Sequence, residues 1–153
     1  MPEEPLGLFA YGSLMWPAIL ARVCQGPDLY GLDSLPAAEA ALLLDHVRLR
    51  VRGEDYPGLR PQRGGQVEGR LYRPLPAAAW PALDAFEGEE YERVSVPVLL
   101  ADGAQVLAWT YRFRAEMAAR LLPEPWRPQD FEGAAMARFV ARYAGFARPG
   151  PTA

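Results

Sequence analysis

Leu8-Phe9-Ala10-Tyr11-Gly12-Ser13-Leu14-Met15-Trp16 is the stretch that says most about the fold of this chain. Its apolar first part, which begins at residue 6 and ends at residue 10, predicts a short buried strand. Gly12 lacks a Cβ, so the backbone can turn sharply there or admit a ligand close to it. Ser13 is predicted to cap a helix that begins near Met15. A strand that ends in Gly-Ser before a helix directs several N–H groups toward one spot, which suits a carboxylate or a developing oxyanion. The motif alone favours a plain strand–turn–helix corner, and only a partner elsewhere in the chain would make it a site.

The composition is that of an ordinary globular protein. The 153 residues predict a single domain over residues 1–153, with 50% of them hydrophobic and 23% charged. A formal net charge of -3 gives no sign of a nucleic-acid or anionic-membrane partner. The acidic start Met-Pro-Glu-Glu-Pro is unlike a signal peptide, and no apolar run approaches the roughly 20 residues of a membrane span. We therefore expect a cytoplasmic protein with no nucleic-acid and no membrane partner.

A scarcity of reactive side chains narrows the chemistry. The chain has no Lys, which excludes a Schiff base and a P-loop, and its single His and single Cys argue against a protein-built zinc site. The serines are Ser13, Ser34 and Ser95, and only His46 could activate one of them. We interpret His46, in a predicted hairpin turn or strand edge, as a surface or turn residue and Cys24 as a buried thiol. If the protein is an enzyme, its chemistry therefore belongs to a carboxylate and to backbone donors.

Hydrophobic patterns and turn residues predict the other elements. Helices are predicted over residues 16–24, 77–86 and 129–143, and strands over residues 47–52, 66–72, 91–100 and 105–113. Residues 37–44 fit a helix or a strand, and residues 114–122 fit a short helix or an irregular arm. Gly88 is a natural cap for the second helix, and Asp102-Gly103 is a strong hairpin signal.

Two further segments bear on a binding surface. Residues 53–65 are rich in glycine and proline and predict a long loop, of the kind that often lines or covers a site. The strand over residues 47–52 places three arginines on one face, which we interpret as a solvated face rather than an anion groove. Gly69, within the strand over residues 66–72, predicts a bulge or a close approach of another backbone.

The tripeptide Phe-Glu-Gly occurs twice, and its two contexts differ. Glu132 is predicted near the start of a helix, where the helix dipole favours an acidic side chain. Glu87 is predicted at the end of its helix, where the dipole disfavours a carboxylate, and Glu89 and Glu90 follow it. Neighbouring negative charges raise the pKa of a carboxyl group, so Glu87 is a candidate general base. A surface carboxylate remains the other interpretation of Glu87.

Four blocks of sequence together resemble a known family. They are Phe9-Ala10-Tyr11-Gly12-Ser13-Leu14, Tyr56-Pro57-Gly58-Leu59, Val67-Glu68-Gly69-Arg70-Leu71-Tyr72, and Leu83-Asp84-Ala85-Phe86-Glu87-Gly88 with Tyr91-Glu92-Arg93. In order and spacing they resemble the gamma-glutamylcyclotransferase-like superfamily, in the branch of gamma-glutamylamine cyclotransferase and the plant avirulence-induced proteins. Met15-Trp16-Pro17 departs from many members, and Met15-Trp16 is similar to the glutathione-specific ChaC branch instead.

The resemblance implies a fold, a reaction and a site. The implied fold is α+β, a small mixed β-barrel flanked by helices. The implied reaction is cyclisation of a γ-glutamyl amine, amino acid or peptide to 5-oxoproline with release of the free amine, without a metal or cofactor. The resemblance makes Glu87 the catalytic acid/base and places the γ-glutamyl group against the loop of Tyr11, Gly12, Ser13 and Leu14.

Three tyrosines and two alternative functions complete the expectations. Tyr56, Tyr91 and Tyr111 are candidate substrate contacts, although packing or structural hydrogen bonding explains each of them as well. One alternative function is a non-catalytic protein that binds a small molecule in the same pocket. The other is a non-catalytic domain that assembles through exposed aromatic residues, namely Trp109, Trp126 and Phe146.

Overall fold

The computed structural model describes residues 5, 7–25 and 36–142. In chain order its elements are β1 (Leu8–Ala10), η1 (Ser13–Met15), α1 (Pro17–Gln25), β2 (Glu39–Val51), β3 (Pro57–Tyr72), α2 (Ala79–Glu87), β4 (Tyr91–Leu100), β5 (Gln105–Phe113), η3 (Ala115–Arg120), β6 (Leu121–Pro125), α3 (Pro128–Phe131) and α4 (Ala134–Arg142). Among the described residues, no helix is both long and apolar enough to cross a lipid bilayer.

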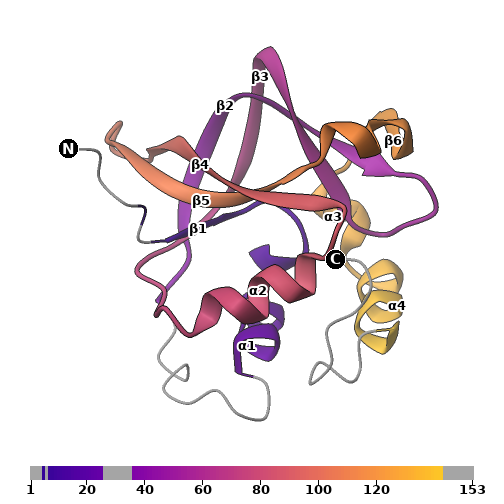
Figure 1. The fold of residues 1–153 in the computed structure, drawn as a ribbon, viewed down its shortest axis with the longest axis horizontal. Coiled ribbons are helices and arrows are strands. Elements are labelled where there is room, and N and C mark those ends of the chain that lie inside the picture. Colours follow the sequence, from indigo (N-terminus) through magenta and orange to yellow (C-terminus); the bar gives the residue numbers. More distant parts are fainter. Residues whose placement is uncertain (1–4, 6, 26–35, 143–153) are drawn as a thin grey trace.

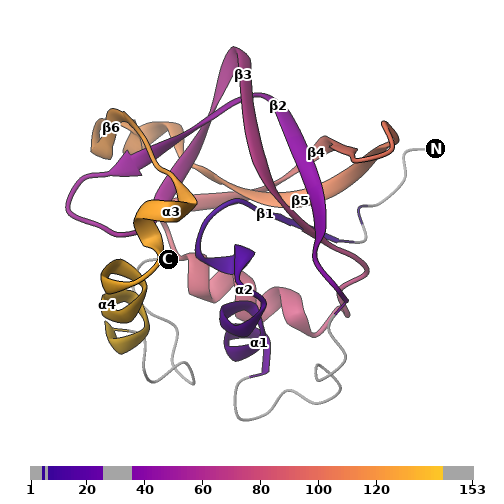
Figure 2. The ribbon, with the colours of Figure 1, turned by 180° about the vertical axis from the view of Figure 1, so that it is seen from behind.

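The strands β1 to β5 close into a barrel. Their order is β3-β1-β5-β4-β2, and a further pairing of β2 with β3 joins the two ends. β1 pairs in parallel with β5, whereas the other pairings are antiparallel, so the sheet is mixed. β6 adds to the outer edge of β2. Figures 1 and 2 show α1 and α2 together against one end of the barrel. The α+β fold with a mixed barrel and flanking helices, implied by the resemblance, is therefore confirmed.

The long β2–β3 hairpin differs from the sequence predictions. Residues 57–65 belong to β3 and not to a loop, and the first five of them pair with the second half of β2, from Arg50↔Pro57 to His46↔Pro61. Asp45 and His46 lie inside β2, at a shift in register where Asp45 has a φ of 59°, and not in a hairpin turn. Between the pairs Leu44↔Gln66 and His46↔Pro61, β2 advances by two residues and β3 by five, so the extra residues form a bulge in β3 opposite Asp45. The undecided segment 37–44 is β-strand from Glu39 onward.

β1 lies between β3 and β5 and is almost completely covered. Leu8 and Phe9 are each 1% exposed. Gly69 of β3 lets β1 approach closely, because an added Cβ would lie 2.4 Å from the carbonyl oxygen of Ala10. The predicted close approach at Gly69 is therefore confirmed. Thr110 of β5 holds the other side through a hydrogen bond from its Oγ1 to the carbonyl of Phe9 (2.8 Å).

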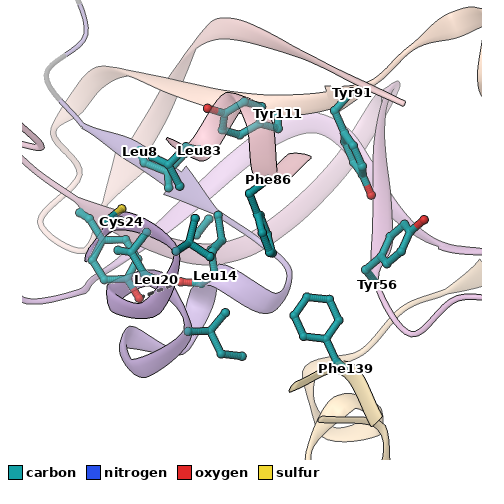
Figure 3. Packing of buried hydrophobic residues seen from close by; sticks show 14 of the residues in the cluster. Leu8, Leu14, Leu20, Cys24, Tyr56, Leu83, Phe86, Tyr91, Tyr111 and Phe139 are labelled. Carbon is teal, nitrogen blue, oxygen red and sulfur yellow. Dashed lines mark hydrogen bonds between the residues drawn. The ribbon is translucent and has the colours of Figure 1, made fainter. Parts of the chain in front are cut away.

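The helix α2 was predicted nearly correctly. It begins two residues later than expected and buries Ala79, Leu83 and Phe86. Gly88 ends it with a φ of 77°, and its N–H donates to the carbonyl of Asp84 (3.1 Å). Figure 3 shows the resulting core, in which Phe86 lies between the barrel and Phe139 of α4.

The end of the described chain was predicted less well. The expected helix over residues 129–143 is two helices, α3 and α4, separated at Gly133, whose φ of 85° is incompatible with helix continuation. Its apolar stripe is nevertheless correct, since Phe131, Ala135 and Phe139 are buried. The strand β6 was not predicted at all. Trp126 is 5% exposed rather than a surface aromatic, and Phe146 lies outside the described residues.

Candidate active site

A cavity of about 360 Å³, including its open mouth, lies where β1 leaves the barrel. All eight predicted site residues line it: Tyr11, Gly12, Ser13, Leu14, Tyr56, Glu87, Tyr91 and Tyr111. They come from four separate parts of the chain, and β1 and Pro57 complete the lining. The structure thus brings the predicted residues together, while their roles in binding or catalysis stay predictions.

The Tyr11–Leu14 turn, as we call this loop, runs into the short helix η1 (Ser13–Met15) and not into a capped α-helix. Ser13 is the first residue of η1 rather than its cap, and no side chain caps η1 at Gly12. The first N–H groups of a helix lack intrahelical partners, so this turn carries backbone donors beside the cavity. A side chain at Gly12 would crowd Pro57, because an added Cβ would lie 3.0 Å from two of its ring carbons.

Two side chains hold the turn against the barrel. The hydroxyl of Tyr72 donates to the carbonyls of Leu14 (3.0 Å) and Met15 (2.9 Å). Arg48 donates from Nη1 to the carbonyl of Tyr11 (2.9 Å) and from Nε to the carbonyl of Trp126 (3.2 Å), with its guanidinium 5.3 Å from the Trp126 ring. Arg48 is therefore partly buried and links the turn to the segment at Trp126, and it does not belong to a solvated basic face. The strand alternation alone could not reveal this, because the acceptors are distant backbone carbonyls.

Glu87, the last residue of α2, is the partly buried carboxyl group of the cavity. Burial and, after it, the charge of Asp84 raise the pKa of Glu87 to about 8. The sequence predicted a raised pKa but attributed it to Glu89 and Glu90. Asp84 lies three residues before Glu87, so both side chains project from one face of the helix. The i, i+3 spacing is the signal that could have identified Asp84.

Asp84 also organises two neighbours. The hydroxyl of Tyr111 donates to its Oδ1 (2.7 Å), and Arg93 forms an ion pair with the same carboxylate (3.0 Å). Burial is the main reason that the pKa of Tyr111 lies far above its usual value, and the hydrogen bond to Asp84 adds to it. Tyr111 is therefore neutral, and its hydroxyl group donates its hydrogen bond to Asp84.

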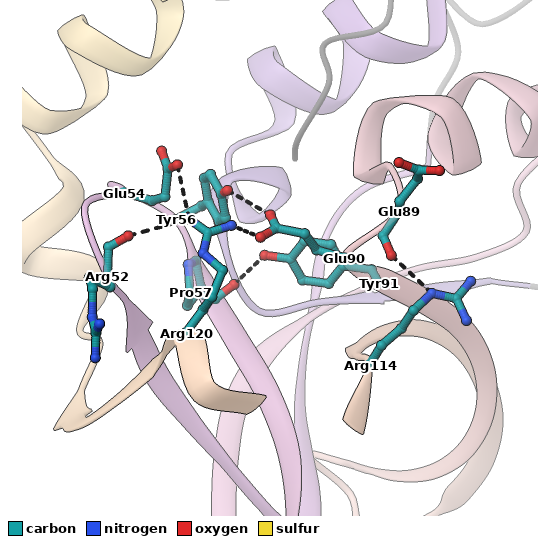
Figure 4. Close-up of polar contacts among 9 residues, drawn as sticks. All are labelled: Arg52, Glu54, Tyr56, Pro57, Glu89, Glu90, Tyr91, Arg114 and Arg120. Atoms are coloured by element: carbon teal, nitrogen blue, oxygen red, sulfur yellow. Dashed lines mark hydrogen bonds and ion pairs between the residues drawn. The ribbon is translucent and has the colours of Figure 1, made fainter. Parts of the chain in front are cut away.

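The remaining site tyrosines are likewise tied to the protein. Tyr11 donates to the carbonyl of Tyr111 (2.5 Å), and Tyr91 donates to the carbonyl of Pro57 (2.7 Å). Tyr56 donates to Oε1 of Glu90 (2.8 Å), which is 4% exposed and forms an ion pair with Arg120 of η3 (Figure 4). Structural hydrogen bonding thus accounts for these hydroxyl donors, while the rings form the cavity wall.

The other reactive side chains lie apart from this cavity. His46 is 9% exposed, not a surface residue, and its Nδ1 lies 2.9 Å from the carbonyl of Leu44. Cys24 is buried, as predicted, and burial raises the pKa of its thiol to about 12. Neither lines the cavity, and Ser34 lies outside the described residues. The described part of the chain contains no group of three or more His, Cys, Asp or Glu arranged to hold a metal ion.

Solved structures of similar shape give the class of fold. A solution structure of an Arabidopsis thaliana protein matches with a TM-score of 0.66 and 25% identity, over 94% of this chain and 82% of that one. A gamma-glutamyl cyclotransferase structure matches with a TM-score of 0.61 over 97% of this chain and 90% of that one. Its 18% identity makes it a likeness of fold alone.

Sequence comparison then gives the family. Residues 8–128 match the family model described as gamma-glutamyl cyclotransferase, AIG2-like, and the chain belongs to this family. AIG2-like protein A of Arabidopsis thaliana is 30% identical over 127 residues, which are 78% of this chain and 71% of that protein. AIG2-like protein C of the same plant is 29% identical over 130 residues, which are 82% of this chain and 71% of that protein.

Proposed function

We propose that the protein is a γ-glutamyl cyclotransferase that converts a γ-glutamyl amine, amino acid or peptide into 5-oxoproline and the free amine. The observation that carries the proposal is the position of Glu87: a carboxyl group with a pKa near 8 shares one cavity with the Tyr11–Leu14 turn. The family match supports the same reaction. A protein that only binds a ligand does not need a carboxyl group in its pocket whose pKa lies near neutral pH.

The first half of the reaction requires a base. The substrate carries its own nucleophile, the α-amine, which enters as an ammonium ion. The Glu87 carboxylate takes one proton from it, and the free amine attacks the γ-carbonyl carbon of the same molecule to form a five-membered ring. Because the attack is intramolecular, a pocket that holds the γ-glutamyl chain bent supplies much of the rate. The Tyr11–Leu14 N–H groups are the donors suited to the oxyanion that forms on the carbonyl oxygen.

The second half requires an acid. The bond between the γ-carbon and the leaving nitrogen breaks, and the protonated Glu87 returns its proton to that nitrogen. The ring nitrogen gives up its second proton, which the released amine takes up, so the products are 5-oxoproline and the amine as its ammonium ion, and Glu87 ends as the carboxylate with which it began. A carboxyl group whose pKa lies near the working pH can perform both transfers. We expect neither a metal nor a cofactor in this scheme.

The test is release of 5-oxoproline from a panel of γ-glutamyl amines, amino acids and peptides, with the product measured by mass spectrometry. Glu87→Gln should lower kcat by roughly 10²- to 10⁴-fold, the usual contribution of a general acid or base. Glu132→Gln is the matched control, because it changes the exposed glutamate of the other Phe-Glu-Gly tripeptide and should leave the rate unchanged.

The outcomes separate the candidate functions. Turnover that survives Glu87→Gln would remove Glu87 from the mechanism. Binding of γ-glutamyl compounds without turnover by the unmodified protein would favour the small-molecule binding protein. The assembly hypothesis required exposed aromatic residues, but Trp126 is buried. Trp109 is partly covered by Arg93, whose guanidinium lies 4.7 Å from the Trp109 ring.

A further inference from the structure

An open groove adjoins the cavity at Glu87. It encloses about 840 Å³ including its mouth. Glu87, Tyr91 and Tyr111 line both the cavity and the groove, so they form the wall at which the two spaces meet. The rest of the groove is lined mainly by charged side chains: Asp84, Glu92, Arg93 and Arg114, with Gly88 and Trp109.

The chemistry of the proposed reaction assigns the two spaces to the two halves of a substrate. Glu87 must reach both the attacking amine and the leaving nitrogen, so the bond that breaks lies beside Glu87. The γ-glutamyl half then occupies the smaller cavity next to the Tyr11–Leu14 turn, and the leaving group extends into the groove. This step rests on the proposed function.

Most charges in the groove already have partners. Arg93 makes two contacts with the carboxylate of Asp84 (3.0 and 3.4 Å) and lies over the rings of Trp80 and Trp109. Glu92 lies 4.0 Å from Nη2 of Arg112. These pairs leave little net charge of their own on this side of the groove.

Arg114 differs from Arg93. Its Nε donates to the backbone carbonyl of Glu89 (3.0 Å), which fixes the side chain just beyond β5 (Figure 4). Its terminal Nη groups have no carboxylate partner within 4.0 Å among the residues that the structure describes. A guanidinium held at one nitrogen, with its other two nitrogens beside an open groove, is suited to bind a carboxylate through two hydrogen bonds.

We propose that the groove is the leaving-group site and that Arg114 binds a carboxylate of the leaving group there. Arg114 is then a specificity-determining residue: it favours γ-glutamyl compounds whose released amine bears a carboxylate over those that release a plain amine. The Glu89 carbonyl keeps the guanidinium in place, and Glu89 stands two residues after Glu87, so the hydrogen bond ties Arg114 to the loop that follows Glu87.

A pair of substrates that differ only in the carboxylate tests the proposal. γ-Glutamylalanine releases alanine, whereas γ-glutamylethylamide releases ethylamine, which is alanine without its carboxylate. The unmodified protein should have the higher kcat/KM for γ-glutamylalanine. Arg114→Gln should lower that value roughly tenfold, the usual effect of losing hydrogen bonds to a charged group, and leave the value for γ-glutamylethylamide nearly unchanged. Arg114→Lys should keep part of the preference.

Arg63→Gln is the matched control, because Arg63 is an exposed arginine that lines neither space. Equal losses for both substrates in Arg114→Gln, or no loss for either, would overturn the inference. If the unmodified protein released 5-oxoproline from none of the substrates, the proposed function itself would be refuted. Calorimetric binding of the two compounds to Glu87→Gln protein, with and without Arg114→Gln, decides the preference independently: a preference for the carboxylate that disappears with Arg114 supports the leaving-group site, and no preference refutes it.

Discussion

At the scale of single residues, the site depends on a carboxyl group that is difficult to ionise. Glu87 has a pKa of about 8 because the helix end is buried and Asp84 lies on the same helix face. Burial is the larger cause, so most of the shift belongs to the packing of α2 against the barrel. Asp84 contributes the part that a single substitution can remove.

The pH dependence of turnover follows from this pKa. If the ionised Glu87 is the base, kcat/KM should rise about tenfold per pH unit below pH 8 and level off above it. Asp84→Asn should move the midpoint to lower pH, because it removes the charge that opposes ionisation of Glu87. The substrate amine titrates identically in both proteins, so the difference between their pH profiles isolates Glu87. Asp130→Asn, an exposed change outside the cavity, should leave the midpoint where it was; an unmoved midpoint in Asp84→Asn would contradict the assignment.

At the scale of elements, the close contact between β1 and β3 sets the position of the Tyr11–Leu14 turn. Gly69→Ala places a Cβ 2.4 Å from the carbonyl oxygen of Ala10 and 2.6 Å from Cζ of Phe9, so β1 must move away from β3. We expect the free energy of unfolding to fall by about 1–3 kcal/mol, as in other overpacked cores, and KM to rise as the turn shifts. Denaturant unfolding and steady-state kinetics would measure the two effects.

Gly53→Ala is the comparison for Gly69→Ala. Gly53 has a φ of 77°, and an added Cβ there would meet nothing within 4 Å. Its substitution should cost roughly 1–2 kcal/mol through backbone strain and leave KM unchanged. A normal KM in Gly69→Ala would show that the turn does not depend on this contact.

The elements that the sequence predicted are those whose signals are local. α2 has an apolar stripe and Gly88 at its end, and the β4–β5 hairpin has Asp102-Gly103 at its turn. The elements that it missed depend on distant partners. Residues 57–61 have the composition of a loop, yet pairing with β2 makes them strand, because tertiary context overrides β-propensity. β6 is strand only because it lies along β2.

The site shows the same division. The resemblance identified the residues that line the cavity, including Glu87 and the Tyr11–Leu14 turn. It gave no role to Arg48, which contacts backbone carbonyls, and none to Arg120, which forms an ion pair with Glu90. Asp84 stood within a recognised block, but its effect on Glu87 required the position of both side chains. Such contacts join segments far apart in the sequence, so no local pattern contains them.

At the scale of the whole molecule, a carboxyl group that resists ionisation makes stability depend on pH. The pKa of Glu87 is about 8 in the folded protein and near 4.5 in the unfolded chain, so between these values the folded state holds one more proton. The stabilisation is complete below pH 4.5 and is lost as the pH rises through 8. The unfolding free energy should therefore fall with pH in this window, by at most about 1.4 kcal/mol per unit from this group.

Glu87→Gln removes this dependence. The difference in unfolding free energy between the variant and the unmodified protein should favour the variant more at pH 8 than at pH 5. Urea unfolding of both proteins at both pH values would measure it. Glu132→Gln changes an exposed carboxyl group and should show no such difference. If the advantage of Glu87→Gln were the same at both pH values, the shifted pKa of Glu87 would be refuted. A gain at high pH would also mean that the candidate active site lowers the stability of the fold.

The closure of the barrel by β1 has a consequence for the order in which the protein is made. β1 is the first described strand to leave the ribosome, but two of the hydrogen bonds that fix it and its turn are made with Thr110 and Tyr111, 101 and 100 residues later in the chain than their partners. Contacts of such long sequence separation form late, because the intervening chain must first be ordered. The turn that meets the substrate is therefore translated first and acquires its final geometry last. A nascent chain that stops before β5 would contain the whole Tyr-Gly-Ser-Leu motif and yet have no pocket.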